Sequence, residues 1–176
     1  MAATVVVATV IGGTGTMNAR YKPGDYEARH NEPVWGQRAN FVIAADISAK
    51  PDKPEWEQLW ARLVGDNRFE ICCIPFFVYN LSLGDEVEVD ENHVFCRVVQ
   101  DSGHYTFRAW FGESKDPPER DQLVQWLRGK GCDYEWSSEN LLAIDAPNHD
   151  IAQEAADFLA DLETQGRITF ETGRAA

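Results

Sequence analysis

Apolar and polar positions alternate in several short segments of this chain, which is the pattern of strands with one buried face. The first segment is Phe41–Ile47, where residues 41, 43, 45 and 47 are apolar. Two more, 86–89 and 93–99, lie between turn-forming residues. Ahead of them, the stretch 18–40 is polar and interrupted by prolines, which favours an arm laid over the domain.

The segment 56–64 supports two different structures. Its apolar residues have the spacing of one face of an amphipathic helix. They are Trp56, Leu59, Trp60, Leu63 and Val64. Directly after them, residues 65–67 have turn chemistry, and 68–74 is rich in residues that suit a strand. Periodicity alone therefore predicts a helix, whereas the turn favours a hairpin.

Four blocks of the sequence carry a resemblance to a known family. They are LWARLVGDNRFE at 59–70, IPFF at 74–77, LGDEVE at 83–88 and SGHYTFR at 102–108. In this order they resemble the core of a family of small, mostly bacterial proteins known as domain of unknown function 4265. The resemblance implies that the Gly-Asp of the first block lies in a turn between two strands. We therefore predict that 59–64 is extended and pairs with 68–74. The resemblance implies no activity and no site residue.

After residue 103, the order of elements is predicted without the family. The pattern indicates a strand at 104–111, a helix capped by Asp116 with Pro117 at its first position, strands at 133–136 and 141–145, a helix over 151–162 and a strand at 167–171. This is the β-α-β-β-α-β order of a ferredoxin-like unit. Its sheet would bury one face under both helices and leave the other face free.

Together these elements predict an α+β protein packed as one compact unit. An N-terminal extension or arm covers 1–40, a small antiparallel β-barrel-like sheet covers 41–103, and the ferredoxin-like unit covers 104–176. The start of the arm imitates a dinucleotide-binding turn, but the third glycine that this motif requires is replaced by Asn18. Residues 1–16 are therefore either a loosely held extension or one extra edge strand.

Composition indicates a folded protein with an acidic surface. The chain has 176 residues, of which 44% are hydrophobic, and its 16 Lys plus Arg against 29 Asp plus Glu give a net charge of −13. That hydrophobic content is too high for an intrinsically disordered chain. The charge repels nucleic-acid phosphates and anionic lipids. We therefore expect no nucleic-acid or membrane partner, and a basic protein is the better electrostatic match.

Cysteine usage indicates a reducing environment. The four cysteines form neither a C-x-x-C pair nor the dense, even spacing of a secreted disulfide scaffold. They are Cys72, Cys73, Cys96 and Cys132. We therefore expect a cytoplasmic protein with four buried, unreactive thiols.

The sequence contains no catalytic or metal-binding motif. Its histidines lie too far apart and too far from cysteines at ligand spacing to predict a metal site, and no cofactor is expected. The best candidates for ligand binding are Ser102, His104 and Arg108, because His104 follows a glycine and shares a strand face with Arg108. Such a set suits an anion. The alternative, which we favour, is that Ser102 and His104 form hydrogen bonds to the backbone where the two parts join.

Two further sets are candidates for contact with a partner. The first is an acidic cluster of Asp85, Glu86, Glu88, Asp90 and Glu91. It either attracts a cation or a basic partner, or it is a charged sheet edge that prevents aggregation. The second set is aromatic and consists of Phe76, Phe77 and Tyr79. It forms an apolar interaction patch if all three side chains are exposed.

Two functions from different classes fit these features. The first is a non-enzymatic, acidic cytosolic binding protein of the immunity or antitoxin type, which inhibits a basic partner protein. The second is a small-molecule binding or catalytic domain with a site at the junction of the two sub-domains, near His104 and Arg108. The small size, the negative charge and the lack of a catalytic motif in the sequence favour the first.

Overall fold

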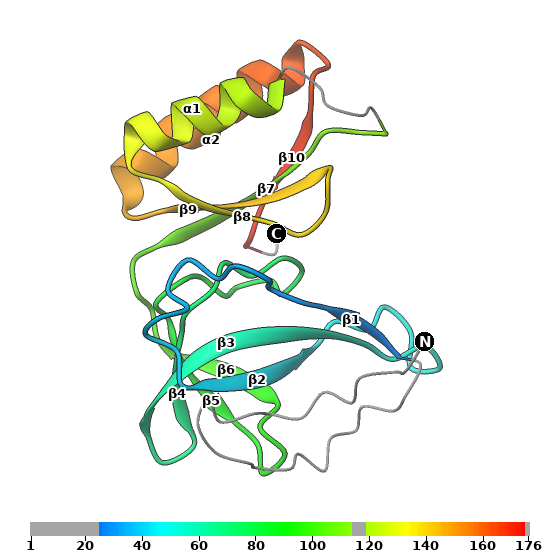
Figure 1. Cartoon of the computed structure of the whole chain (residues 1–176), viewed down its shortest axis with the longest axis vertical. Coiled ribbons are helices and arrows are strands. Elements are labelled where there is room, and N and C mark those ends of the chain that lie inside the picture. Colours follow the sequence, from blue (N-terminus) through cyan, green and yellow to red (C-terminus); the bar gives the residue numbers. More distant parts are fainter. Residues whose placement is uncertain (1–24, 114–118, 175–176) are drawn as a thin grey trace.

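The computed structural model describes residues 25–113 and 119–174 as two β-sheets and two α-helices. Figure 1 shows the two sheets one above the other, with both helices on the outer side of the second sheet. The predicted α+β class is confirmed. Residues 1–16 and the helix cap at Asp116 and Pro117 lie outside the described residues. Within the described part, no helix is long and apolar enough to cross a membrane.

The first sheet contains six strands. They are β1 (Tyr26–Ala28), β2 (Phe41–Asp46), β3 (Glu55–Gly65), β4 (Arg68–Ile71), β5 (Glu86–Val89) and β6 (Phe95–Gln100). The long strand β3 pairs with β2 along one edge and with both β1 and β4 along the other. The strand β1 comes from the segment predicted to be an arm, and it runs parallel to β3.

The first sheet is strongly curved but does not close into a barrel. A single isolated bridge, Ala44–Val94, brings the start of β6 beside β2. No continuous ladder joins β2 and β6, because each pairs along its length with a different strand. The predicted barrel-like closure is therefore wrong, whereas the strands within 41–103 pair antiparallel as predicted. The one parallel pair joins β3 to β1, which lies outside that range.

The predicted hairpin of β3 with β4 is confirmed. Leu63 pairs with Phe69, and Asn67 turns the chain with a positive φ of 53°. The helical spacing of the apolar residues would have placed Leu63 and Val64 on the buried face with Leu59. In the strand, Leu63 and Val64 are exposed, whereas Leu59 is buried. Pairing with strands on both edges outweighs local periodicity here.

The second sheet follows the predicted element order. Its elements are β7 (Tyr105–Trp110), α1 (Glu119–Lys130), β8 (Asp133–Trp136), β9 (Leu141–Ala146), α2 (His149–Thr164) and β10 (Thr169–Thr172). The strands lie in the order β10-β7-β9-β8, and every neighbouring pair is antiparallel. Leu123 and Leu127 of α1 pack with Leu159 of α2 in the core above the sheet.

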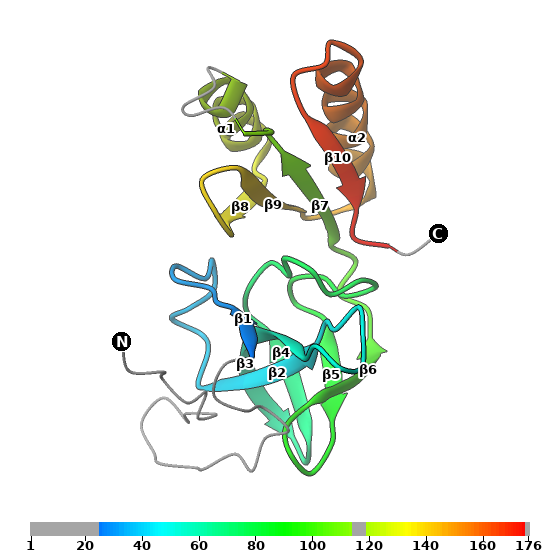
Figure 2. The same ribbon diagram turned by 90° about the vertical axis from the view of Figure 1, so that its right-hand side faces the viewer.

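The other face of the second sheet meets the first half of the chain. Ala143 of β9 packs against Ile74 and Phe76, which belong to the loop between β4 and β5. Figure 2 shows this loop region lying between the two sheets. The expectation that this face is free is therefore wrong for its central part, because the loop covers it.

Candidate functional site

His104 and Arg108 lie on the predicted strand region but contact different partners. His104 Nδ1 lies 2.8 Å from Asp145 Oδ2, and this hydrogen bond raises the pKa of His104 above its usual value. The buried Arg108 donates from Nη2 to the Val78 carbonyl oxygen at 2.6 Å and from Nη1 to Glu171 at 3.1 Å. The two side chains therefore do not form one anion site in this structure.

Ser102 and Asp85 form a local structural contact. The Asp85 carboxylate accepts hydrogen bonds from the backbone N–H groups of Ser82 and Ser102, both at 2.8 Å. The Ser102 hydroxyl donates to the Leu83 carbonyl oxygen at 2.7 Å. Asp85 is only 4% exposed, and burial raises the pKa of its carboxyl group. The prediction of Asp85 as a surface charge is corrected, because its carboxylate holds two loops together.

The rest of the acidic cluster is mostly engaged within the chain. Glu86 pairs with Arg68 at 2.5 Å, and Glu88 pairs with Arg97. Asp90 accepts hydrogen bonds from two backbone N–H groups of its own turn. Glu91 is exposed at that turn. The cluster therefore carries less uncompensated charge than the sequence suggests.

The three aromatic residues do not form one exposed patch. Phe76 is 1% exposed and Phe77 is partly buried, whereas Tyr79 is 45% exposed. Tyr79 donates its hydroxyl to Glu171 and lies against the Arg108 guanidinium, 4.8 Å from the ring centroid. The condition for an aromatic patch is therefore not met, because Phe76 packs in the core between the sheets.

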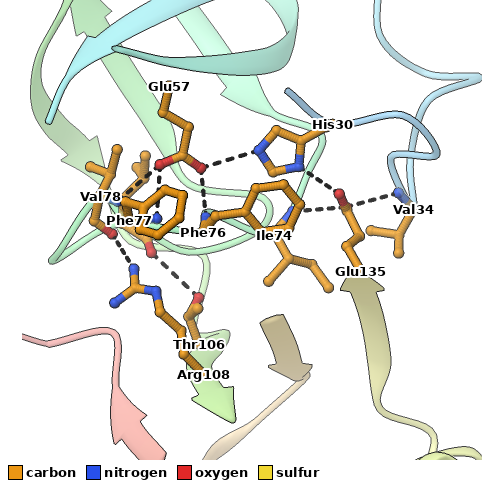
Figure 3. Close-up of polar contacts among 11 residues, drawn as sticks. His30, Val34, Glu57, Ile74, Phe76, Phe77, Val78, Thr106, Arg108 and Glu135 are labelled. Carbon is orange, nitrogen blue, oxygen red and sulfur yellow. Dashed lines mark hydrogen bonds and ion pairs between the residues drawn. The ribbon is translucent and has the colours of Figure 1, made fainter. Parts of the chain in front are cut away.

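The main polar site of the structure lies between the two sheets and joins His30, Glu57 and Glu135 (Figure 3). Glu57 is on β3, and its side chain is fully buried. Its carboxylate accepts hydrogen bonds from three consecutive backbone N–H groups, those of Phe76, Phe77 and Val78, at 2.5 to 3.0 Å. One carboxylate thus fixes the conformation of the loop on which the second sheet rests.

Glu135 makes the matching contacts from the second sheet. It lies on β8, and its Oε1 accepts hydrogen bonds from the backbone N–H groups of Val34 and Ile74 at 3.0 and 2.9 Å. Its Oε2 lies 2.6 Å from His30 Nδ1. A side chain of the second sheet therefore binds the arm and the loop of the first half at the same time.

His30 connects the two carboxylates. Its Nε2 lies 3.1 Å from Glu57, and its ring stacks on Phe76 with 3.9 Å between centroids. Since both ring nitrogens face carboxylate oxygens, both carry protons and the imidazole is a cation. Burial alone would lower the pKa of His30, but the hydrogen bonds to the carboxylates of Glu135 and Glu57 raise it well above its usual value.

This His–carboxylate network is suited to holding the halves together rather than to turning over a substrate. The His30 and Glu57 side chains have no exposed surface, and that of Glu135 has 3%. Both histidine nitrogens and all four carboxylate oxygens have partners. Among the described residues, no set of three or more His, Cys, Asp or Glu side chains is arranged as a metal site.

The sequence analysis missed the network, although one signal for it is present. Once 55–65 is taken as a strand, Glu57 has the same phase as Leu59 and Ala61, which are buried. A carboxylate in the inward phase of a strand needs hydrogen-bond donors. Nothing in the sequence identifies those donors, because His30 lies 27 residues away from Glu57 and 105 from Glu135.

Two hollows of the surface adjoin residues of the second sheet. One of about 230 Å³ is lined by Arg108, Trp110, Leu141, Thr169, Phe170 and Glu171. The Nε of Arg108 is buried and has no hydrogen-bond partner among the described residues. The other hollow, of about 340 Å³, is lined by residues 134–136 of β8 together with Asn31 and Glu32.

The cysteines differ in accessibility. Burial raises the pKa of Cys72 to about 12 and that of Cys132 to about 11, and it also raises the pKa of the fully buried Cys73. Cys96 is exposed, which corrects the expectation of four buried thiols. All four are free.

We predict that iodoacetamide modifies only Cys96 in the folded protein at pH 8, because the other thiols are shielded and un-ionised. Mass spectrometry should find one adduct in buffer and four in 8 M urea. Rapid modification of Cys73 in buffer would contradict the enclosed environment of the His–carboxylate network. The Cys96→Ser protein is the control and should remain unmodified in buffer.

These features define an α+β protein whose two sheets are joined by a buried network of one histidine and two carboxylates. The chain belongs to the family described as Domain of unknown function (DUF4265), whose model matches residues 57–170. The resemblance seen in the sequence is confirmed. The matched region includes Glu57 and Glu135, and it begins after His30.

One solved structure is similar to this chain. It is described as "Novel crystal structure of a hypothetical protein from Neisseria gonorrhoeae", and it has 18% sequence identity and a TM-score of 0.64. The similarity covers 76% of this chain and 93% of that chain. At this identity the likeness concerns the fold alone. No curated protein is significantly similar to the chain.

Proposed function

We propose that this protein is a non-enzymatic binding protein of the immunity or antitoxin type, which inhibits a basic partner protein through an acidic surface. The observation that carries the proposal is one face of α2. Its exposed acids are spaced by three or four residues, so they form a single stripe. They are Asp150, Glu154, Asp157 and Asp161. The engagement of the interior acid–base groups in the His–carboxylate network also supports a role without catalysis.

Toward the C-terminal end of α2, the stripe is electrostatically unfavourable within the chain. Among the described residues only Glu154 has a Lys or Arg partner, which is Lys130. The last turn of α2 contains no basic residue, and Asp161 lies there. Like charges four residues apart, and acids near a helix C-terminus, each destabilise a helix by a few tenths of a kcal/mol, roughly. A basic partner would relieve both effects.

Charge reversal on α2 provides the test. The double variant Asp150→Lys, Asp161→Lys should weaken association with a basic partner at least tenfold, because it changes the local charge by four units. The variant Glu88→Lys, Glu91→Lys makes the same change of charge on the first sheet and is the matched control. Proteins captured from a lysate of the source organism by each variant should be identified, and association rates measured at 50 and 300 mM salt.

A partner with a high isoelectric point that depends on α2, and whose association slows as salt rises, is the expected result. Equal capture by wild type and the α2 variant would contradict the proposal for this helix. If the Glu88, Glu91 variant alone loses the partner, the binding surface is the acidic cluster predicted at 85–91 instead.

A second candidate function is small-molecule binding in the 230 Å³ hollow beside Arg108. The 39% exposed Trp110 favours it, since it gives the hollow an apolar wall beside the Arg108 guanidinium. A thermal-shift screen with small carboxylic acids tests this candidate. Stabilisation of wild type but not of Trp110→Ala would support it.

Two finer assignments complete the proposal. The strand order β10-β7-β9-β8 with both helices on one face supports a ferredoxin-like arrangement of the second half. The four free cysteines support a reducing location such as the cytoplasm.

A further inference from the structure

The hollow of about 340 Å³ described above lies at the outer edge of the second sheet, and we call it the groove from here on. One wall is β8, and the other is the segment Asn31–Glu32. In the order β10-β7-β9-β8, β8 is a terminal strand, so within the described residues it has a neighbour on one edge only. An open strand edge next to a groove is a site where an extended peptide adds to a sheet.

The direction of the main-chain groups of β8 follows from its pairing. Residues of an antiparallel pair exchange hydrogen bonds at every second position. The N–H of Ser137 donates to the Leu141 carbonyl oxygen, so the next hydrogen-bonded pair is Glu135 with Ala143. Tyr134 and Trp136 therefore direct their N–H and C=O groups away from β9. These groups face the open edge of the sheet, where the groove lies.

The two sides of the groove carry opposite charges. On the side of the arm, Glu32 is exposed and has no ion-pair partner among the described residues. On the helix side, Arg120 lies over the Trp136 ring at 4.3 Å, and Arg128 donates to the Tyr134 hydroxyl. A bound segment would therefore need a basic side chain facing the arm and no basic side chain facing the helices.

We propose that a segment of the partner protein adds to β8 as an extended strand, with one basic residue facing Glu32 and an uncharged residue on each side of it. A residue directly opposite Glu135 shares its face of the sheet, whereas its two neighbours point toward the helices. The hydrogen bonds come from Tyr134 and Trp136. This inference rests on the proposed function, because it takes the partner to be a basic protein.

Short peptides test the inference on the full-length protein. The probe is Ac-Ser-Val-Arg-Val-Ser-NH2, and the first control replaces its arginine by glutamate. Titration into ¹⁵N-labelled protein should shift the amide signals of Tyr134 and Trp136. The arginine peptide should bind at least tenfold more tightly than the glutamate peptide, because it places a cation rather than an anion beside the Glu32 carboxylate.

Methylated peptides separate strand addition from simple charge attraction. The two valines lie opposite Tyr134 and Trp136, so their N–H groups point into β8, whereas the arginine N–H points away. Methylation of both valine amides should abolish the signal shifts. Methylation of the arginine amide should change the affinity less than threefold. Equal effects of the two methylations would overturn the proposal, and so would shifts confined to residues outside β8 and the arm.

Variants of the protein complete the test. Glu32→Gln should weaken binding of the arginine peptide about fivefold without changing the melting temperature, since Glu32 is exposed. Glu139→Gln, which alters an exposed acid in the loop after β8, should leave it unchanged. Unchanged binding by Glu32→Gln would overturn the assigned orientation. If no peptide binds while the partner still depends on α2, this inference fails and the proposed function stands.

Discussion

Glu57→Gln is expected to lower the free energy of unfolding by about 3–5 kcal/mol, which is the usual effect of removing one partner from a buried ion pair. The substitution keeps the size of the side chain but removes its charge. An amide presents one acceptor and two donors, so it cannot accept from all three N–H groups of Phe76, Phe77 and Val78. It also leaves the His30 cation with one carboxylate.

Urea denaturation followed by tryptophan fluorescence and circular dichroism measures this effect. The control is Glu55→Gln, two residues earlier on the same strand, whose partner Lys53 is 74% exposed. That variant should change the free energy of unfolding by less than about 1 kcal/mol. A loss below about 1 kcal/mol for Glu57→Gln would mean that the loop is held by other contacts.

The second large effect concerns pH. The pKa of His30 is raised in the folded protein, so the unfolded chain loses this proton first as the pH rises. The stabilisation is therefore complete below the unfolded pKa of about 6.5 and declines as the pH rises toward the folded pKa. We expect the free energy of unfolding to fall between pH 6.5 and 8.5 by up to about 1.4 kcal/mol per pH unit for each such histidine.

His104 contributes in the same direction, because its hydrogen bond to Asp145 raises its pKa. Urea denaturation of His104→Asn across this pH range isolates the contribution of His30. A long-range ¹H–¹⁵N spectrum at pH 8 provides a direct check, since both ring nitrogens of His30 should carry protons. A neutral His30 at pH 7 would show that the His–carboxylate network holds one proton fewer than its geometry indicates.

The sequence predicted elements whose signals are local. The helix over 151–162 and the strands around 133–145 were found because the spacing of their apolar residues is visible within one segment. The strand β1 was not predicted, since three residues of a polar arm become a strand only by pairing with β3, about thirty residues further along. The hairpin at 65–67 came from family resemblance, because local periodicity indicated a helix.

The side-chain contacts of the candidate site were harder to predict from the sequence than the helices and strands. His104 and Ser102 were identified from a glycine and a strand phase, and the structure gives both of them structural partners from other segments of the chain. Asp85 was identified as a surface charge because neighbouring acids suggested an exposed edge, yet two backbone donors from separate loops enclose it. Burial of a polar side chain depends on donors supplied by distant segments, and one sequence does not show which segments meet.

The position of Glu135 has a consequence for how the chain is made. During synthesis, residues 25–100 leave the ribosome before β8 does. Domains generally fold in the order in which they are synthesised, and at the usual rate of synthesis a few seconds, roughly, separate the appearance of residue 100 from that of β8. Until Glu135 emerges, His30 has one carboxylate partner and the N–H groups of Val34 and Ile74 lack their acceptor. The buried contacts of the first half are therefore completed only after the second half has been synthesised.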